Sequence, residues 1–265
     1  MDQGYDDTLK AVQQLEKKIV SLLENAQEGR VRCQMIQRKY PQYFVTIKEG
    51  EADIKKERYL KKTEIDLARE LVQKEYYNRL LKAARKLEKR ILRRGEEPNF
   101  YDLKNVYLEF PVAKRILIKP LILSDEEYLE KWYQCGKAES NPYPIGNGFL
   151  TEKGETVRSK SEKMIADKFY LRKIPYKYEA PLKLDGRGWL YPDFTLLNLR
   201  TRKTFYLEHY GMMDDAEYCR KALEKNELYE SNGIYPGDRL LFSFECSLKS
   251  INMKEIDYLI DRYLL

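Results

Sequence analysis

The segments between Phe149 and Glu245 constrain the fold of this chain most strongly. A helical pattern in ETVRSKSEKMIADKFYLRKI is followed by three apolar segments, YKYEAPL, WLYPDFTLL and TFYLEHYG. Residues 214–226 are again helical in pattern, and RLLFSFE reads as a later strand. This order of helix, three strands, helix and strand predicts an α/β (α+β) domain, in which helices flank a mixed central sheet.

Two helices and a β-hairpin are predicted in the first part of the chain. Apolar side chains recur at steps of three and four over residues 6–28 and 63–94, which predicts two amphipathic helices. Between them, alternating segments with a turn at Lys39, Tyr40 and Pro41 predict a hairpin closed by Gly50. We therefore divide the chain into a helical region with a hairpin (1–95), a connector with packed structure (96–148) and a second domain (149–265).

Composition limits the class of protein. Hydrophobic residues make up 43% of the chain, enough to fill a core. The four cysteines lie far apart without a CxxC pair, so neither a zinc site nor a disulfide framework is indicated. The sequence shows neither a signal peptide nor a membrane-spanning stretch, and we expect a cytoplasmic protein with no membrane partner.

Charge is concentrated in the second predicted helix. The whole chain carries only +6, but residues 74–94 hold nine lysines or arginines against two glutamates. Lys82, Lys86 and Arg90 recur at helical spacing on one face, where they either contact nucleic-acid phosphates or form an ordinary solvated surface. The first helix is a candidate for self-association or for binding a partner protein.

Two acids interrupt apolar strand segments of the second domain. Asp193 follows Pro192 among leucine, tyrosine and phenylalanine, and Glu208 follows the apolar run Phe-Tyr-Leu. Burial of a carboxylate is costly unless the group is paired or binds a metal, so two such acids on adjacent strands predict a shared cation. Their separation of 15 positions fits antiparallel neighbours, and oxygen ligands suit Mg²⁺ or Mn²⁺.

The elements VRSKSE, YEAPL, YPDF and YLEHYG together resemble the PD-(D/E)XK nuclease superfamily, in a subgroup with histidine at the usual lysine position. The resemblance spans roughly residues 149–245. It implies a restriction-endonuclease-like core in which Asp193, Glu208 and His209 are catalytic and the two acids bind the metal. Glu162 would be a further catalytic residue and metal ligand.

The same resemblance suggests phosphate contacts for two cations that precede Glu162. Arg158 and Lys160 would take this role, and ordinary solvated charge is the alternative for both. Glu162 has the alternative of a surface helix residue paired with a nearby lysine. His209, the sole histidine, has the alternative of a structural side chain. Because strand side chains alternate, Glu208 and His209 should face opposite sides unless the strand bulges.

These patterns predict a metal-dependent endonuclease or phosphodiesterase that acts on nucleic acid, with DNA favoured over RNA. The alternative is a catalytically silent nucleic-acid-binding or assembly protein that retains the nuclease fold. The presence of both acids and of the histidine, in the expected order, favours the enzyme.

Overall fold

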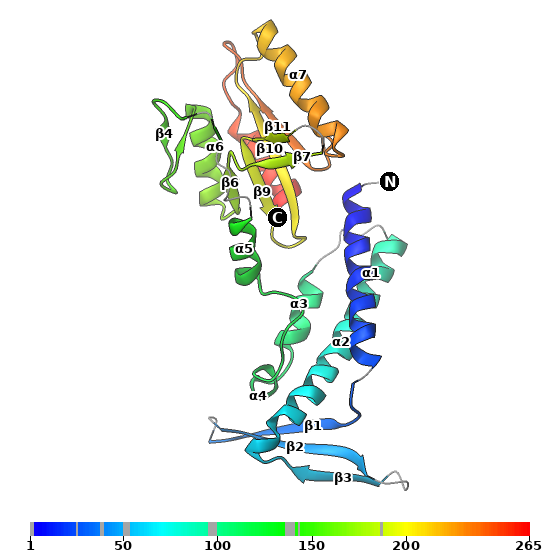
Figure 1. The fold of residues 1–265 in the computed structure, drawn as a ribbon. Coiled ribbons are helices and arrows are strands. Elements are labelled where there is room, and N and C mark those ends of the chain that lie inside the picture. The colour runs from blue at the N-terminus through cyan, green and yellow to red at the C-terminus, as the bar shows by residue number, and fades with distance from the viewer. Residues whose placement is uncertain are drawn as a thin grey trace. The chain divides into compact units, whose positions relative to one another are not determined.

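The computed structural model describes residues 3–24, 26–37, 40–49, 54–94, 100–135, 141–142, 144–185 and 188–265 (Figure 1). The chain divides into two compact units, which are essentially Tyr5–Ser124 and Asp125–Leu265. Both units combine helices with small sheets, which confirms the mixed α and β class. None of the described helices combines the length and the apolar character that crossing a membrane requires.

The unit Tyr5–Ser124 combines helices with a three-stranded antiparallel sheet. The predicted hairpin is confirmed, because β1 and β2 pair antiparallel, but a third strand, β3, also pairs with β2. Lys39 and Gly50, expected to turn and close the hairpin, lie outside the described residues. Placing Tyr40 and Pro41 in the turn was wrong, because they are the first residues of β2 and pair with Ile36 and Met35. The elements are α1 (Gln3–Glu24), β1 (Arg30–Ile36), β2 (Tyr40–Glu49), β3 (Ile54–Tyr59), the short turn η1 (Lys62–Glu64), α2 (Ile65–Arg94), α3 (Tyr101–Leu108) and α4 (Val112–Arg115).

Helix α2 forms the centre of this unit's core. The apolar stripe predicted from the sequence is buried, and full burial of each large side chain stabilises the fold by about 1.5–3 kcal/mol. Val12 and Ile19 of α1 are fully buried in the same core, so the stripe once considered for self-association is used inside the unit. The buried α2 residues are Ala68, Leu71, Val72, Tyr76, Leu80, Leu81, Ala84, Leu87 and Ile91.

The unit Asp125–Leu265 contains the predicted mixed sheet. Its strands lie in the order β11-β10-β9-β6, with β10 parallel to β11 and antiparallel to β9. Strands between α6 and α7 and a later strand after α7 are present as predicted, but five strands, β6 to β10, stand where three were expected, because YKYEAPL also divides between β6 and β7. The elements are α5 (Asp125–Gln134), β4 (Phe149–Leu150), β5 (Thr156–Val157), α6 (Lys160–Leu171), β6 (Tyr176–Tyr178), β7 (Leu182–Leu184), β8 (Gly188–Leu190), β9 (Phe194–Asn198), β10 (Lys203–Tyr210), α7 (Ala216–Ser231), β11 (Leu240–Phe244), α8 (Met253–Leu259) and the terminal turn η2 (Ile260–Leu264).

One expected strand, WLYPDFTLL, is not continuous. Its first residues form β8, which pairs with β7 in a separate hairpin, and its last residues form β9 of the main sheet. Proline donates no backbone hydrogen bond, so Pro192 interrupts the ladder between the two strands. Expecting one strand here was therefore wrong, and Asp193 lies just before β9 rather than within it.

Helices cover both faces of the main sheet (Figure 1). On one face, α6 and α8 pack over Phe205 and Leu207 of β10. On the other face, Tyr206 packs with Tyr229 of α7. The side chains of β10 therefore alternate between two cores, as expected for a strand in the middle of a covered sheet.

Candidate active site

Asp193 and β10 meet as the sequence predicts. In the antiparallel register Phe194 lies opposite Leu207, so Asp193 lies beside the next residues of β10. Its carboxylate oxygen Oδ2 accepts a hydrogen bond of 2.7 Å from the backbone N–H of His209. The backbone of β10 thus orients the acid that follows Pro192.

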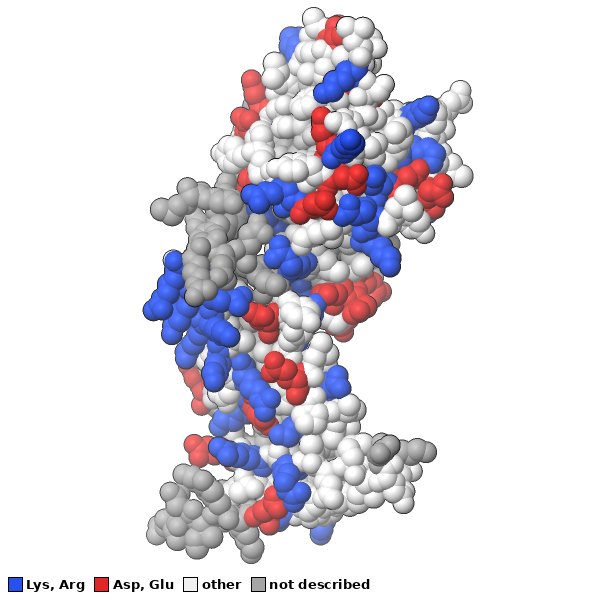
Figure 2. Space-filling view, turned by 180° about the vertical axis from the view of Figure 1, so that it is seen from behind, with Lys and Arg blue, Asp and Glu red and all other residues white. Residues whose placement is uncertain are grey.

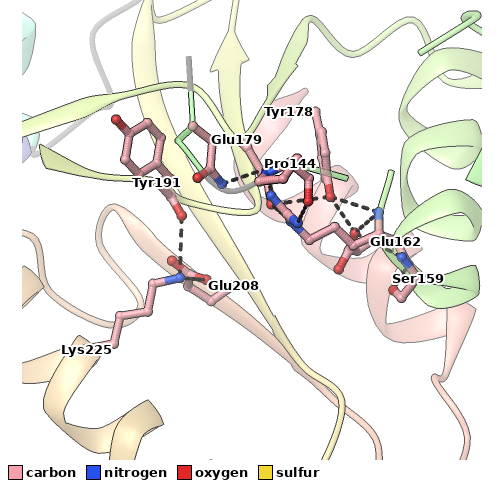
Figure 3. Close-up of polar contacts among 10 residues, drawn as sticks. Pro144, Ser159, Glu162, Tyr178, Glu179, Tyr191, Glu208 and Lys225 are labelled. Carbon is pink, nitrogen blue, oxygen red and sulfur yellow. Dashed lines mark hydrogen bonds and ion pairs between the residues drawn. The ribbon is translucent and has the colours of Figure 1, made fainter. Parts of the chain in front are cut away.

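Glu208 points to the α7 face and is almost fully buried, with its side chain 1% exposed. Its Oε2 accepts from the ammonium of Lys225 at 2.6 Å, and its Oε1 accepts from the hydroxyl of Tyr229. Lys225 and Tyr229 stand four residues apart on α7, which places them on the same helix face. Figure 3 shows the Lys225 ammonium between Glu208 and the backbone of Tyr191, whose carbonyl oxygen it contacts at 3.5 Å. The buried carboxylate is therefore paired with one cation.

Asp193, Glu208 and Lys225 together bring two acids and one base into a buried place. Burial, followed by the negative charge of Glu208, raises the pKa of Asp193 well above its usual range. Burial opposes the charge of Lys225, but Glu208 and Asp193 outweigh it, so the pKa of Lys225 is raised. The Lys225 ammonium is thus the one cation near two carboxyl groups, Asp193 and Glu208. Carboxyl groups in such surroundings would stabilise a further cation.

Glu162 lies at the start of α6, where it closes a capping box. The hydroxyl of Ser159 accepts from the Glu162 N–H at 3.1 Å, while Glu162 Oε2 accepts from the Ser159 N–H at 3.3 Å. The same oxygen accepts from the Arg158 N–H at 2.9 Å and from the Tyr178 hydroxyl at 2.7 Å. The charge of Glu162 contributes to the raised pKa of Asp193, so the two carboxyl groups lie within electrostatic reach.

The side chain of Arg158 is engaged by an acid of the same unit. Its Nε and Nη2 donate to the two carboxylate oxygens of Glu179 at 2.5 and 3.0 Å, a bidentate pair. Figure 3 shows Glu179 beside Tyr178 and Glu162. Burial, followed by the hydrogen bond to Glu162, raises the pKa of Tyr178. Lys160, the first residue of α6, is exposed.

His209 points to the opposite face of the sheet from Glu208. The β10–β11 register is unbroken from Tyr206 to Tyr210, so no bulge turns the imidazole toward the acids. Its Nδ1 lies 2.9 Å from Ser243 Oγ, and its Nε2 lies 3.3 Å from Glu245 Oε1. The structure therefore does not bring the imidazole together with the carboxylates of Asp193 and Glu208.

Glu245 lies beside His209, and its negative charge is stabilised by hydrogen bonds from other residues. It accepts two hydrogen bonds of 2.8 Å from the hydroxyl of Ser161 on α6 and one of 3.2 Å from the Ile251 N–H. Burial opposes the charge of Glu245, yet the bonds from Ser161 and His209 lower its pKa. This group stabilises the contact of α6 with the sheet.

Sequence reasoning missed Lys225, Tyr229 and Glu245. The first two share a face of a helix that was predicted, but their spacing alone gives no sign of which face meets the sheet. Glu245 ends the apolar segment RLLFSFE, so the pattern that singled out Glu208, an acid after an apolar strand, would have found it.

Across the ranges that the structure describes, no cluster of three or more histidine, cysteine, aspartate and glutamate side chains is arranged to hold a metal. Asp193 and Glu208 offer two adjacent carboxylates, a donor type that Mg²⁺ and Mn²⁺ prefer. The pKa of Asp193 is raised first by burial and then by the negative charge of Glu208, which a cation would offset. The two carboxylates are thus of the donor type that such an ion takes, and in this structure both oxygens of Glu208 are bonded, to the Lys225 ammonium and to the Tyr229 hydroxyl.

The other cations singled out from the sequence belong to the unit Tyr5–Ser124. Lys82 and Lys86 are exposed on α2. Arg90 is half-buried, and its guanidinium pairs with Asp102 at 2.8 Å.

Comparison with known proteins gives limited information. No family model matches the sequence, and no solved structure matches it. The chain is similar to the uncharacterized protein MJ1519 of Methanocaldococcus jannaschii, with 38% identity over 94 residues. The matched residues make up 35% of this chain and 8% of that protein. The function is therefore argued from the geometry.

Proposed function

We propose that the unit Asp125–Leu265 is a divalent-metal-dependent nuclease that hydrolyses phosphodiester bonds of nucleic acid, DNA rather than RNA, in the cytoplasm. The observation that carries this proposal is the meeting of Asp193 with Glu208 on neighbouring antiparallel elements, with a raised pKa on Asp193. A mixed sheet of β6, β9, β10 and β11 with α6 before it and α7 between β10 and β11 supports a restriction-endonuclease-like core, although the β7–β8 hairpin is inserted between β6 and β9.

The chain's own groups have distinct roles in this proposal. Asp193 and Glu208 would hold Mg²⁺ or Mn²⁺, with Glu162 as the third acid nearby. A bound divalent ion supplies a water of lowered pKa and neutralises charge on the phosphate. Lys225 keeps its proton, because its pKa is raised, and its side chain is 27% exposed. It can therefore turn from Glu208 to a phosphate oxygen and stabilise negative charge there.

His209 takes a positioning role in this proposal. Its backbone N–H orients Asp193, while its imidazole lies on the α6 face with Ser243 and Glu245. Proton transfer at the phosphate, expected from the resemblance, has no support in this side-chain geometry. Arg158 supports the site through Glu179 and its backbone bond to Glu162.

Cleavage assays test the proposal directly. Purified protein is incubated with single- and double-stranded DNA and RNA in Mg²⁺ or Mn²⁺, beside Asp193→Asn and Glu208→Gln. We expect each substitution to lower cleavage by about 1000-fold, because each removes charge at the reacting centre. Glu217→Gln is the matched control, since Glu217 is an exposed acid on α7 paired with Lys221. Full cleavage by both site variants would contradict the proposal.

A second candidate is a nucleic-acid-binding protein that keeps this fold without turnover. The observation that favours it is the pairing of both Glu208 oxygens, with Lys225 and with Tyr229, which already compensates the buried charge. Calorimetric titration of Mn²⁺ into EDTA-treated protein separates the two. Binding that Glu208→Gln abolishes favours the nuclease. Absence of Mn²⁺ binding, together with tight nucleic-acid binding and no cleavage, favours the second candidate.

A further inference from the structure

Helix α2 carries a row of exposed cations on the side away from its core. Lys82, Lys86, Lys89 and Arg93 follow one another at steps of four, three and four residues, which aligns them on one helix face. All four are exposed, and within the described ranges none has a carboxylate at ion-pair distance. We call these four residues the basic face of α2. Figure 2 shows lysine and arginine side chains gathered there.

The surface around the basic face is hollowed rather than convex. One hollow runs along α2 from Asn78 to Arg93 and is lined by all four residues of the basic face. Two adjoining hollows, one toward the start of β1 and one toward α3, also include Lys82. The cations thus line a connected set of depressions that can follow an extended anionic ligand.

We infer that the basic face of α2 binds the phosphate backbone of double-stranded nucleic acid, at a site separate from Asp193 and Glu208. From Lys82 to Arg93 the row extends about 17 Å, at about 1.5 Å per helical residue. A duplex carries about one negative charge per 1.7 Å of its axis. The row therefore spans about ten phosphate charges of the two strands, enough to engage every cation.

The surroundings favour a duplex over a single strand. Proteins that bind single strands stack the exposed bases on aromatic side chains. Among the described residues that line the three hollows, none is aromatic. Contacts at this surface are therefore directed at phosphates and carry no base specificity.

The same surroundings argue against a membrane surface as the partner. A helix that lies on a membrane inserts an apolar face between the lipids. The apolar stripe of α2 is instead buried in the core of its own unit, and Leu92 is the exposed large apolar side chain of its described part. Charge alone remains for binding, which suits a polyphosphate backbone.

Binding of a fluorescein-labelled 25-base-pair DNA duplex to the full chain, followed by anisotropy in EDTA, tests the inference without any cleavage. The variant Lys82→Gln/Lys86→Gln/Lys89→Gln/Arg93→Gln should weaken binding about 10- to 100-fold at moderate salt. The slope of log K against log salt should fall by about 3 to 4, because each lost phosphate contact removes about 0.9.

Two further variants keep the result interpretable. Lys62→Gln/Lys119→Gln/Lys254→Gln/Arg262→Gln removes the same charge from exposed cations elsewhere and should leave affinity within about twofold. Lys82→Arg/Lys86→Arg/Lys89→Arg preserves the charge and should retain binding, which shows that positive charge rather than lysine itself is required, and urea denaturation of the glutamine variant shows whether it is folded. An unchanged salt slope in the basic-face glutamine variant would overturn the inference.

Two comparison ligands complete the test. The same DNA as a single strand should bind more weakly than the duplex, and tighter binding of the single strand would overturn the assignment. Vesicles containing phosphatidylserine should bind more weakly than the duplex, and tighter binding would show that the partner is a membrane surface. EDTA prevents metal-dependent cleavage, so this assay measures binding alone. Asp193→Asn should therefore bind the duplex as the unchanged chain does, even where it has lost nuclease activity.

Discussion

Strand β10 carries buried polar side chains on both faces, and the two faces differ in how their charge is compensated. On the α7 face, Glu208 and Asp193 share one ammonium, from Lys225, and the pKa of Asp193 is raised. On the α6 face, hydrogen bonds from Ser161 and His209 lower the pKa of Glu245.

The difference shows that burial of a polar group in a strand is not by itself a sign of reactivity. A carboxylate whose partners lower its pKa is stabilised in its charged form and holds its neighbours in place. A carboxyl group whose pKa is raised by burial and by a second acid is destabilised in its charged form, and a nearby cation would stabilise that form. Under the proposed function, the α7 face is therefore the side that binds the ion, and the α6 face is a structural contact.

Removing the cation of the α7 face should have the largest effect on stability. Lys225→Met leaves the buried Glu208 without its ammonium and should lower the free energy of unfolding by about 3–5 kcal/mol. Urea denaturation of the full chain measures this loss. Lys221→Met, which breaks an exposed pair with Glu217 on the same helix, should change stability by less than about 0.5 kcal/mol. Equal effects of the two substitutions would contradict the distinct character of this face.

A substitution on the α6 face should affect stability but not chemistry. His209→Ala removes the imidazole contacts of Ser243 and Glu245, while Glu245 keeps its bonds from Ser161 and Ile251, and we expect a loss of about 2 kcal/mol in urea denaturation. Cleavage by the folded variant should keep its kcat within about threefold, since the imidazole lies away from the acids. A large fall in kcat with an unchanged fold would instead assign His209 to the reaction.

The stability that the two faces contribute should also depend on pH with opposite signs. Because the folded-state pKa of Asp193 is raised, its stabilising contribution is present at low pH and is lost as pH rises from the ordinary value through the raised one. The lowered pKa of Glu245 gives stability that is present above its ordinary pKa and lost as pH falls through the lowered one.

This pH dependence has a direct readout in ion binding. Protons compete with a divalent ion for Asp193, so Mn²⁺ affinity should fall about tenfold for each pH unit below the raised pKa, or about 1.4 kcal/mol. Calorimetric titrations between about pH 8 and pH 5 measure the slope. Asp193→Asn should weaken binding at every pH and flatten this dependence. A slope unaffected by Asp193→Asn would remove this carboxyl group from the ion site.

Tyr229→Phe should have the smallest effect. It removes one of the two side-chain hydrogen bonds of Glu208, so unfolding should require about 1 kcal/mol less. Lys225 continues to pair with the carboxylate in this variant. Urea denaturation beside Tyr258→Phe, an exposed tyrosine on α8, provides the control. A loss as large as that of Lys225→Met would mean that the hydroxyl, and not the ammonium, holds the buried charge.

The mixed character of the sheet and the closeness of Asp193 to β10 could be predicted from the sequence. Apolar segments and their order depend on local patterns, which a single chain displays directly. Strand alternation also predicted that Glu208 and His209 face opposite sides. Tertiary packing decides which helix residues meet a buried acid, so Lys225 and Tyr229 could not be assigned in advance.

Several elements were not predicted, and β3 and α8 show two different reasons. Strand β3, IKKERY, is rich in charge and resembles a polar loop, as edge strands of a sheet often do. The helix α8 was not considered, although Ile256 and Ile260 stand four residues apart and are fully buried. The apolar pattern of α8 is short. A short apolar pattern does not distinguish a helix from a strand, because length is the main difference between the two.

Because of Pro192, the Asp193 carboxylate on the α7 face stands between two strands rather than inside one. The chain leaves one hairpin at Leu190 and enters another sheet at Phe194, so the intervening carboxylate occupies a seam between two ladders. Pleating does not dictate the direction of a side chain at such a seam. The position of Asp193 is set instead by two hydrogen bonds, from the Glu179 N–H to its carbonyl oxygen and from the His209 N–H to its carboxylate.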